Sequence, residues 1–397
     1  MPFKETCAVE ERIAMLREHD TGMFTVGELS ARYGVSRETF YVWKRRREAG
    51  AERWFEDRWR GPGCCPHATN GDVIASIVAL RERFPRLGPK KLLGKLEDRH
   101  RDVAWPAAST VGEILKRAGL IVAKGRRRRP VPQGEMAAGA AEPNGEWSID
   151  FKGWFRTRDG ARCDPLTVAD TASRYLIETR IVAPTHEGVQ GALRRIFEEI
   201  GLPEGMRSDN GPPFGSSGAG GLSRLAVWLL RLAIDVRYIP PASPQHNGRH
   251  ERMHRTLKDE TARPPAATIG EQQARFDRFR RYYNEERPHE ALGQTPPGRH
   301  WQPSARALPR RLAEPWYDAD HEVRRVRPPG TIKWRGEPVF IGEALAGELV
   351  GLAELDHGGH IVRFCGRDLG VIDGDLRFLR FAPPRARLRG AEETERE

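Results

Sequence analysis

The chain has 397 residues, a formal net charge of +11 at pH 7 and a sequence pI near 9.7. This length allows two to four domains, and the basic charge favours nucleic acid or another polyanion as the partner. Five cysteines without Cys-x-x-Cys spacing, no long apolar run and no signal-peptide pattern argue against a disulfide-stabilised secreted protein and a membrane protein. We therefore expect a cytoplasmic protein.

Residues 1–60 have the pattern of a helix-turn-helix domain. Apolar residues recur at helical spacing in residues 10–19, the run Thr25-Val-Gly-Glu28 is a capping box, and Ser36 begins a further helix after a turn at Gly34. The second helix of such a pair enters the major groove. The predicted contacts to bases or phosphates are Arg37, Thr39, Tyr41, Lys44, Arg45 and Arg46. The alternative is a small helical bundle with a basic surface.

Residues 67–120 show a second set of apolar residues at helical spacing, interrupted by a turn at Gly88-Pro89. This pattern predicts a second helical domain, which is compatible with a second helix-turn-helix. Residues 121–145 are first basic and then rich in Ala, Gly and Pro, as in a linker. We expect its cations to follow the DNA backbone, namely Lys124, Arg126, Arg127, Arg128 and Arg129.

Residues 146–300 alternate between strand and helix patterns. The expected strands cover 147–155, 166–170, 175–182, 206–209 and 236–239, and the expected helices cover 186–200, 222–233 and 247–260. The order is three strands, helix, strand, helix, strand, helix. It predicts an α/β sandwich with a mixed five-stranded sheet.

Three acidic residues of this region, Asp150, Asp209 and Glu251, lie in separate patterned runs. A right-handed crossover would make the first and fourth strands parallel neighbours, and Glu251 would approach from the first turn of a helix beside them. Oxygen ligands suit Mg²⁺ or Mn²⁺ rather than zinc, and two such ions can serve phosphodiester chemistry. Taken singly, each acid also fits a turn or a helix start.

The helix that carries Glu251 begins with further polar residues. Asn247 and Arg249 are predicted DNA contacts, because a helix N-terminus with an Arg favours phosphate. His246, His250 and His254 are spaced by four and share a helix face. We expect them to form exposed polar surface facing DNA rather than a zinc site, because no fourth ligand lies nearby. Asp170 is expected to serve a turn.

Residues 319–382 consist of short apolar runs separated by Gly, Pro and Asp, which predicts a small β-barrel. The Arg cluster at 324–327 favours non-specific DNA contact, whereas dimerisation or packing is an equal alternative. Residues 383–397 have the composition of a disordered tail.

Residues from about 145 to 297 resemble the integrase core of bacterial insertion-sequence transposases, which are related to retroviral integrases. The resemblance is carried by four motifs: Trp147-Ser-Ile-Asp150, Ser208-Asp-Asn-Gly211, Asn247-Gly-Arg-His-Glu251, and Tyr283-Asn-Glu-Glu-Arg-Pro-His289 followed by Thr295-Pro296. It implies a ribonuclease-H-like fold with Asp150, Asp209 and Glu251 as the catalytic and metal-binding residues. Two Mg²⁺ ions, replaceable by Mn²⁺, would be the cofactors.

The resemblance also implies what such a protein does. It would bind the terminal inverted repeats of its element, cleave the 3′ ends and join them to target DNA, as a homo-oligomer at the nucleoid and not at a membrane. Two other classes stay open. The first is a DNA-binding regulator with an inactive core, and the second is a structure-directed nuclease. The three acids count against the first and the tandem N-terminal domains against the second.

One feature departs from that family. Glu251 lies 42 positions after Asp209, which is longer than usual. The additional length is assigned to Gly215-Ser-Ser-Gly-Ala-Gly-Gly221, a flexible segment by composition. We expect a tolerated surface insertion rather than an element that orders when substrate binds.

Overall fold

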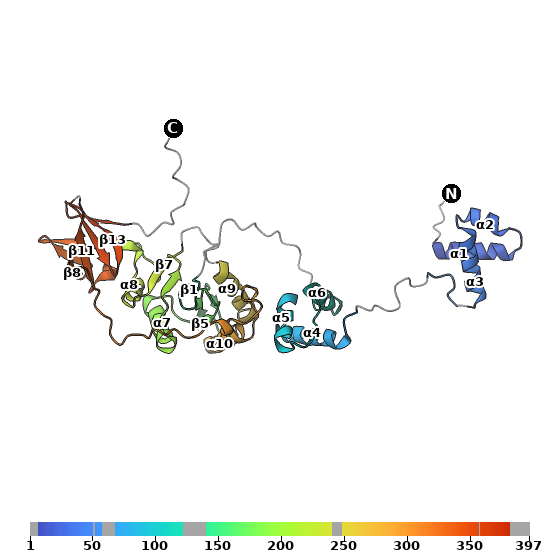
Figure 1. Ribbon diagram of the computed structural model, residues 1–397, viewed down its shortest axis with the longest axis horizontal. Helices are drawn as coiled ribbons and strands as arrows, with labels where there is room; N and C mark the ends of the chain where they lie inside the picture. Colours follow the sequence, from blue (N-terminus) through green and yellow to red (C-terminus); the bar gives the residue numbers. More distant parts are fainter. Residues whose placement is uncertain are drawn as a thin grey trace, which may run out of the picture. The chain divides into compact units, whose positions relative to one another are not determined.

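The computed structural model describes residues 7–50, 52–57, 68–121, 140–239, 248–356 and 358–381. The chain divides into two compact units, Met1–Asn70 and Gly71–Glu397 (Figure 1). Across the described ranges, no helix combines the length and the apolar character needed to cross a membrane. The predicted tail at 383–397 and most of the predicted linker, residues 122–139, lie outside the described residues.

The first unit is helical, as predicted. It contains α1 (Ala8–Asp20), α2 (Val26–Arg32) and α3 (Arg37–Glu48) (Figure 1). The expected capping box opens α2, because Thr25 N–H donates to Glu28 Oε2 at 2.8 Å. Ser36 caps α3 by accepting the backbone N–H of Thr39 at 3.1 Å. The three helices enclose a small core of Met15, Leu16, Leu29, Phe40 and Trp43.

The second unit begins with three helices, α4 (Gly71–Arg83), α5 (Pro89–Arg99) and α6 (Ala108–Arg117), around a core of their own. The predicted helical region is therefore present. Helix α5 is attached to the following core by Lys95, which donates to the backbone oxygen of Glu286 at 2.8 Å. Asp98 adds a two-pronged ion pair with Arg299, with both N···O distances at 2.7 Å.

The core contains the mixed five-stranded sheet that the sequence predicts. Its strand order is β5-β4-β1-β6-β7, formed by Leu176–Ile181, Pro165–Asp170, Trp147–Phe151, Gly205–Ser208 and Asp235–Tyr238. The pairs β5–β4 and β4–β1 are antiparallel, whereas β1–β6 and β6–β7 are parallel. This is the ribonuclease-H-like arrangement.

Helices cover both faces of this sheet. One face packs against α7 (His186–Ile200) and α8 (Arg224–Arg231), with Trp147, Leu193 and Trp228 in the shared core. The other packs against α9 (Gly248–Thr261) and α10 (Ile269–Glu285), with Leu176, Met253 and Phe276 in a separate cluster. Side chains alternate between the faces of a strand, so Ser148 and Asp150 of β1 face α9 while Ile149 enters the opposite core.

The first predicted strand is too long. It ends at Phe151 rather than at residue 155, and Phe155–Arg156 (β2) pairs instead with Arg162–Cys163 (β3) in a short hairpin. Gly153, which lies between the end of β1 and the start of β2, has a φ of +80°, a conformation that glycine adopts without steric cost. The aromatic residues within 147–155 favour a strand throughout, but the backbone conformation after Phe151 ends the strand early.

The predicted C-terminal β-barrel is wrong in one respect, because the sheet is open. Five antiparallel strands have the order β14-β13-β12-β11-β8, formed by Phe378–Arg380, Arg367–Ile372, His360–Phe364, Leu349–Glu354 and His321–Arg325. Within the described residues, β8 and β14 are its edges and do not pair with each other. A separate hairpin, β9 (Thr331–Trp334) with β10 (Glu337–Phe340), accompanies the sheet.

The physical reason lies in where this region buries its apolar side chains. Val350, Leu352 and Trp334 belong to the same hydrophobic cluster as Leu222 and Trp228 of the core. The region is therefore shielded from water by the core as well as by its own strands, and closure is not needed to bury it.

The glycine-rich segment 215–221 is not the surface insertion that its composition predicts. Ala219 and the following Leu222 are 5% and 1% exposed. The segment carries the short helix η1 (Ala219–Gly221), and a Cβ added at Gly220 would lie 3.1 Å from Leu369 of β13. Arg380 of β14 donates to the backbone oxygen of Ser217 at 2.6 Å. The segment thus joins the core to the C-terminal sheet.

Candidate active site

The three predicted acids lie on the elements expected for them. Asp150 is the fourth residue of β1, Asp209 directly follows β6, and Glu251 is in the first turn of α9. Strands β1 and β6 are parallel neighbours, as predicted, with Trp147 opposite Met206 and Ser148 opposite Arg207. Two residues further along, the same register reaches Asp150 on one strand and Asp209 at the end of the other.

Asp209 has an environment that penalises its negative charge. Asp209 is exposed, yet partial desolvation by the surrounding protein raises the pKa of its carboxyl group. A hydrogen bond from the backbone N–H of Gly211 to Oδ1, at 3.1 Å, acts in the opposite direction. Within the described residues, no Arg or Lys forms an ion pair with Asp209.

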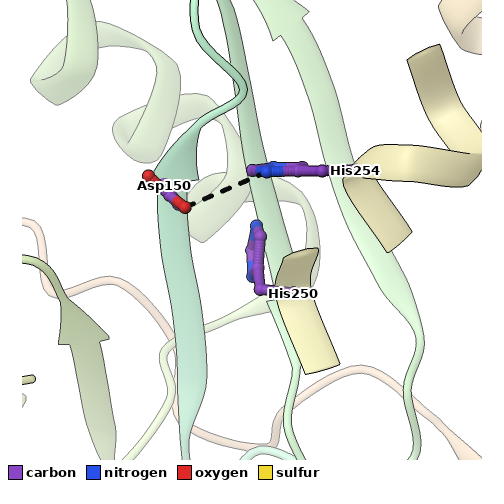
Figure 2. A group of neighbouring side chains, drawn as sticks. All are labelled: Asp150, His250 and His254. Atoms are coloured by element: carbon purple, nitrogen blue, oxygen red, sulfur yellow. Dashed lines mark ion pairs between the residues drawn. The ribbon is translucent and has the colours of Figure 1, made fainter. Parts of the chain in front are cut away.

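Asp150 lies beside two buried histidines, His250 and His254 (Figure 2). Oδ2 of Asp150 is 3.9 Å from Nδ1 of His254, which comes from α9. Thr167, which lies opposite Asp150 on β4, contacts both imidazoles: its Oγ1 is 2.6 Å from His250 Nε2 and 2.7 Å from His254 Nε2. The other nitrogen of His250, Nδ1, is 2.8 Å from Ser148 Oγ.

These positions correct the expectation that the histidines form exposed surface facing DNA. His250 and His254 are 4% and 6% exposed and point toward the sheet (Figure 2), while His246 lies outside the described residues. Burial lowers the pKa of His250 to about 4. Burial, followed by the nearby His250 and Lys152, lowers the pKa of His254 as well. Both imidazoles are therefore neutral at pH 7.

One sequence signal could have predicted this burial. Met253 and Leu257 recur at helical spacing with the two histidines, and all four face the sheet. The two apolar residues, Met253 and Leu257, mark the buried face of α9. The polar histidines on that face concealed the pattern.

Glu251 follows His250 on the helix and is exposed. Among the described residues, two groups of at least three side chains have candidate ligand atoms within 4.8 Å of one another: Asp150 with His250 and His254, and Asp318 with Asp320 and His321. Asp150, Asp209 and Glu251 do not form such a group. Their convergence on metal ions remains a prediction, and residues 240–247, which precede Glu251, lie outside the described chain.

Three of the six DNA contacts predicted for the first unit share one exposed side of α3. Arg37, Tyr41 and Arg45 are exposed at spacings of four, which is the repeat of one helix face. Thr39, Lys44 and Arg46 are half-buried, and the Arg46 guanidinium lies 4.4 Å from the centre of the Trp43 ring. Of the other predicted contacts, Lys124, Arg126, Arg127, Arg128, Arg129 and Asn247 lie outside the described residues, as does the side chain of Arg249.

Asp170 serves the turn that the sequence predicts for it. It is 1% exposed, its Oδ1 accepts the backbone N–H of Ser173 at 2.7 Å, and its Oδ2 accepts that of Asn144 at 2.7 Å. Its carboxylate thus accepts backbone N–H groups from the turn between β4 and β5 and from the segment before β1, and it is separate from the site around Asp150.

Family comparisons agree with this architecture. Family models described as Integrase core domain match residues 140–244 and 232–297. A Helix-turn-helix domain model matches residues 11–63, and a Homeodomain-like domain model matches residues 39–115.

Similar proteins come from insertion elements and retroviruses. The chain is 27% identical over 232 residues to the insertion element IS476 uncharacterized 39.2 kDa protein of Xanthomonas euvesicatoria, covering 57% of this chain and 63% of that protein, just under two thirds. It is 27% identical over 239 residues to the IS407 uncharacterized 31.7 kDa protein of Burkholderia multivorans, covering 58% and 81%. It is also 34% identical over 189 residues to the Gag-Pol polyprotein of baboon endogenous virus, covering 46% and 10%.

Among solved structures, a simian T-cell lymphotropic virus intasome chain matches with a TM-score of 0.37 and 17% identity, covering 72% of this chain and 92% of that one. The HTLV-2 integrase catalytic core matches with a TM-score of 0.32 and 16% identity, covering 41% and 99%. Segments of this chain therefore match integrase-core, helix-turn-helix and homeodomain-like domain models, and the chain is similar to insertion-element proteins and retroviral polyproteins.

Proposed function

We propose that the protein is a transposase that binds the terminal inverted repeats of an insertion sequence, cleaves the 3′ ends and joins them to target DNA. The observation that carries this proposal is the parallel register of β1 and β6 in a region that matches an integrase core model. Ser148 lies opposite Arg207, and each is followed two positions later by one of the proposed acids, Asp150 or Asp209. Glu251 comes from α9, the helix that packs on the same face of β1 as Asp150.

The donor set of the proposed site fits a hard divalent cation. Three carboxylates offer only oxygen ligands, which suits Mg²⁺ and allows Mn²⁺ to replace it. In this proposal Asp150 and Asp209 share one ion, and Glu251 completes a second site. When bound, two such ions activate the attacking oxygen and stabilise the leaving one.

The rest of the chain would recognise and hold the DNA. Residues 1–60 and 67–120 would read the inverted repeats, with Arg37, Tyr41 and Arg45 of α3 facing the duplex. The linker at 121–145, through Lys124 and the four arginines that follow Gly125, would contact phosphates, as would Asn247 and Arg249. Residues 146–300 would form the catalytic core, and residues 319–382 a domain that supports it. Two element ends must meet one target, so we expect a homo-oligomer on the DNA.

A strand-transfer assay tests the proposal. The full-length protein is incubated with DNA from the borders of the encoding element, a plasmid target, and Mg²⁺ or Mn²⁺, beside the variant Glu251→Gln. We expect joined products that the variant loses while it still binds the ends, because the amide keeps the shape of the side chain and removes its negative charge.

The alternative function is a DNA-binding regulator with an inactive core. One observation favours it, namely that the three carboxylates do not form a group within 4.8 Å. This alternative predicts specific end binding with no cleavage or joining under either metal, so the same assay separates the two functions.

A further inference from the structure

The polar cluster beside Asp150 is buried at its centre and half-buried at Ser148, and its members contact one another in sequence. Its contacts run from Ser148 Oγ to His250 Nδ1 at 2.8 Å, and from His250 Nε2 to Thr167 Oγ1 at 2.6 Å. They continue from Thr167 Oγ1 to His254 Nε2 at 2.7 Å, and end with His254 Nδ1 at 3.9 Å from Asp150 Oδ2. Thr167 is fully buried, and both histidines are more than nine-tenths buried. Polar groups this deep in a core have to be hydrogen-bonded to one another.

The carboxylate determines the direction of these hydrogen bonds. A neutral imidazole has one N–H donor and one acceptor nitrogen, and a negative charge beside Nδ1 favours the proton on that nitrogen. His254 then directs its N–H at Asp150, and its Nε2 accepts the hydroxyl proton of Thr167. Thr167 in turn accepts the Nε2–H of His250, whose Nδ1 accepts the hydroxyl proton of Ser148. In this assignment three imidazole nitrogens form hydrogen bonds of 2.6–2.8 Å, and the fourth, His254 Nδ1, has an electrostatic contact of 3.9 Å with Asp150.

Two backbone oxygens compete for the hydroxyl protons. Thr167 Oγ1 is 3.1 Å from the backbone oxygen of Asp150, and Ser148 Oγ is 3.1 Å from that of Ala169. Both contacts are longer than the hydroxyl–imidazole contacts of 2.6–2.8 Å. The shorter contacts favour the imidazole nitrogens over the backbone oxygens as partners of the hydroxyl groups, and the negative charge of Asp150 then sets the direction.

The same geometry argues against a metal site within the cluster itself. Three of the four imidazole nitrogens already lie within 2.8 Å of a hydroxyl oxygen. An ion held by both rings would have to displace Thr167, which β4 holds between them in the sheet. The rings therefore act through hydrogen bonds.

We propose that Ser148, His250, Thr167 and His254 form a one-directional hydrogen-bond chain that positions the carboxylate of Asp150 for its metal ion. The inference rests on the proposed function, because it takes Asp150 to be a metal ligand. In metal sites generally, partners that orient a ligand without touching the ion contribute to affinity. His254 is then a positioning residue that acts through Asp150.

Substitution of Thr167 tests the hydrogen-bond chain at its centre without altering Asp150. Thr167→Val keeps the shape of the side chain and removes the hydroxyl, whereas Thr167→Ser keeps the hydroxyl. Each full-length protein is bound to element-end DNA. Its Mn²⁺ dissociation constant is measured by electron paramagnetic resonance, and the Mn²⁺ concentration for half-maximal strand transfer is measured in parallel. We expect Thr167→Val to weaken Mn²⁺ binding by about 10- to 100-fold, and Thr167→Ser to restore it.

A purely structural role would give a different result. Thr167→Val would then lower the melting temperature while the Mn²⁺ dissociation constant stayed unchanged, and this outcome overturns the proposal. Ser148→Ala, at the half-buried far end of the chain, supplies a milder variant in case Thr167→Val does not fold. It should weaken Mn²⁺ binding in the same direction by a smaller factor, and an unchanged constant would also count against the chain.

The two proposals can fail separately. If the unsubstituted protein binds Mn²⁺ but joins no DNA, the transposase function fails, and the comparison of Mn²⁺ dissociation constants still decides on the chain. If the unsubstituted protein joins DNA and Thr167→Val requires the same Mn²⁺ concentration, the proposed hydrogen-bond chain is wrong and the transposase function stands. If it binds no Mn²⁺ and joins no DNA, both are overturned.

Discussion

Adjacent residues of β1 serve opposite purposes because their side chains alternate between the two faces of the sheet. Ile149 is 2% exposed in the core formed with α7 and α8, whereas Ser148 and Asp150 meet α9 on the other face. A single strand thus supplies an apolar anchor and a polar site. The site is held by the same backbone hydrogen bonds that hold the core.

Protonation of the single residue His250 makes the free energy of unfolding depend on pH. Its pKa is lowered from 6.5 to about 4, so the unfolded chain binds the proton more tightly than the folded one. The stability that this histidine contributes is fully present above pH 6.5 and is lost as the pH falls toward 4. Between pH 7 and pH 5 we expect a loss of about 2 kcal/mol in the free energy of unfolding.

Urea unfolding followed by tryptophan fluorescence measures this loss. His250→Gln, which stays neutral at every pH, should lose correspondingly less stability over the same interval. His100→Gln, at an exposed position, is the matched control and should follow the unsubstituted protein. Coinciding profiles for His250→Gln and the unsubstituted protein would contradict the assignment.

At the scale of elements, helix α5 docks on the core at a glycine. A Cβ at Gly94 would lie 2.7 Å from Cβ of Gln294. Helix α5 and the segment at Gln294 can therefore lie this close only because residue 94 has no side chain. Around this contact, Lys95 and Asp98 bind Glu286 and Arg299. A small residue and flanking ion pairs together define the position of α5.

Two glycine-to-alanine changes separate helix propensity from docking. In α6, a Cβ at Gly112 would meet only the side chain of Pro89 at 3.8 Å, an ordinary contact. Gly112→Ala should therefore raise the free energy of unfolding by up to about 1 kcal/mol, which is the usual gain in a helix. Gly94→Ala should not raise the free energy of unfolding in this way, because the clash with Gln294 offsets the gain in helix propensity. Hydrogen exchange in α5 should also become faster. Equal stabilisation by both changes would show that α5 does not dock closely.

At the scale of the whole molecule, the second unit depends on the glycine-rich segment that joins the core to the C-terminal sheet. Leu369 of β13 is fully buried and lies against Gly220. Arg231 of α8 forms an ion pair with Glu348, next to β11. The sheet and the core therefore share one hydrophobic cluster, and we expect them to unfold together.

Truncation of Leu369 tests this coupling. Leu369→Ala removes buried methyl groups and should lower the free energy of unfolding by about 2–5 kcal/mol. Hydrogen exchange should accelerate in residues 214–222 as well as in the C-terminal strands. Leu379→Ala, on edge strand β14 and 57% exposed, is the control and should change stability by less than about 0.5 kcal/mol. Acceleration confined to the C-terminal strands would show that the two parts are independent.

The sequence by itself determined the order of helices and strands in the core, the helix caps at Thr25 and Ser36, and the positions of Asp150, Asp209 and Glu251 on their elements. These features depend on periodicity, capping and short motifs, all of which are local in the chain. The parallel pairing of β1 with β6 also followed, because the handedness of crossover connections leaves few topologies.

Only the tertiary structure decided which surfaces are buried. It turned His250 and His254 toward Thr167, packed Ala219 and Leu222 between the core and the C-terminal sheet, and left that sheet open. Each outcome depends on partners that are distant in sequence: β4 for the histidines, and β13 and β14 for the glycine-rich segment. Local composition carries no information about such partners, because a polar or flexible segment is buried only when a complementary surface meets it.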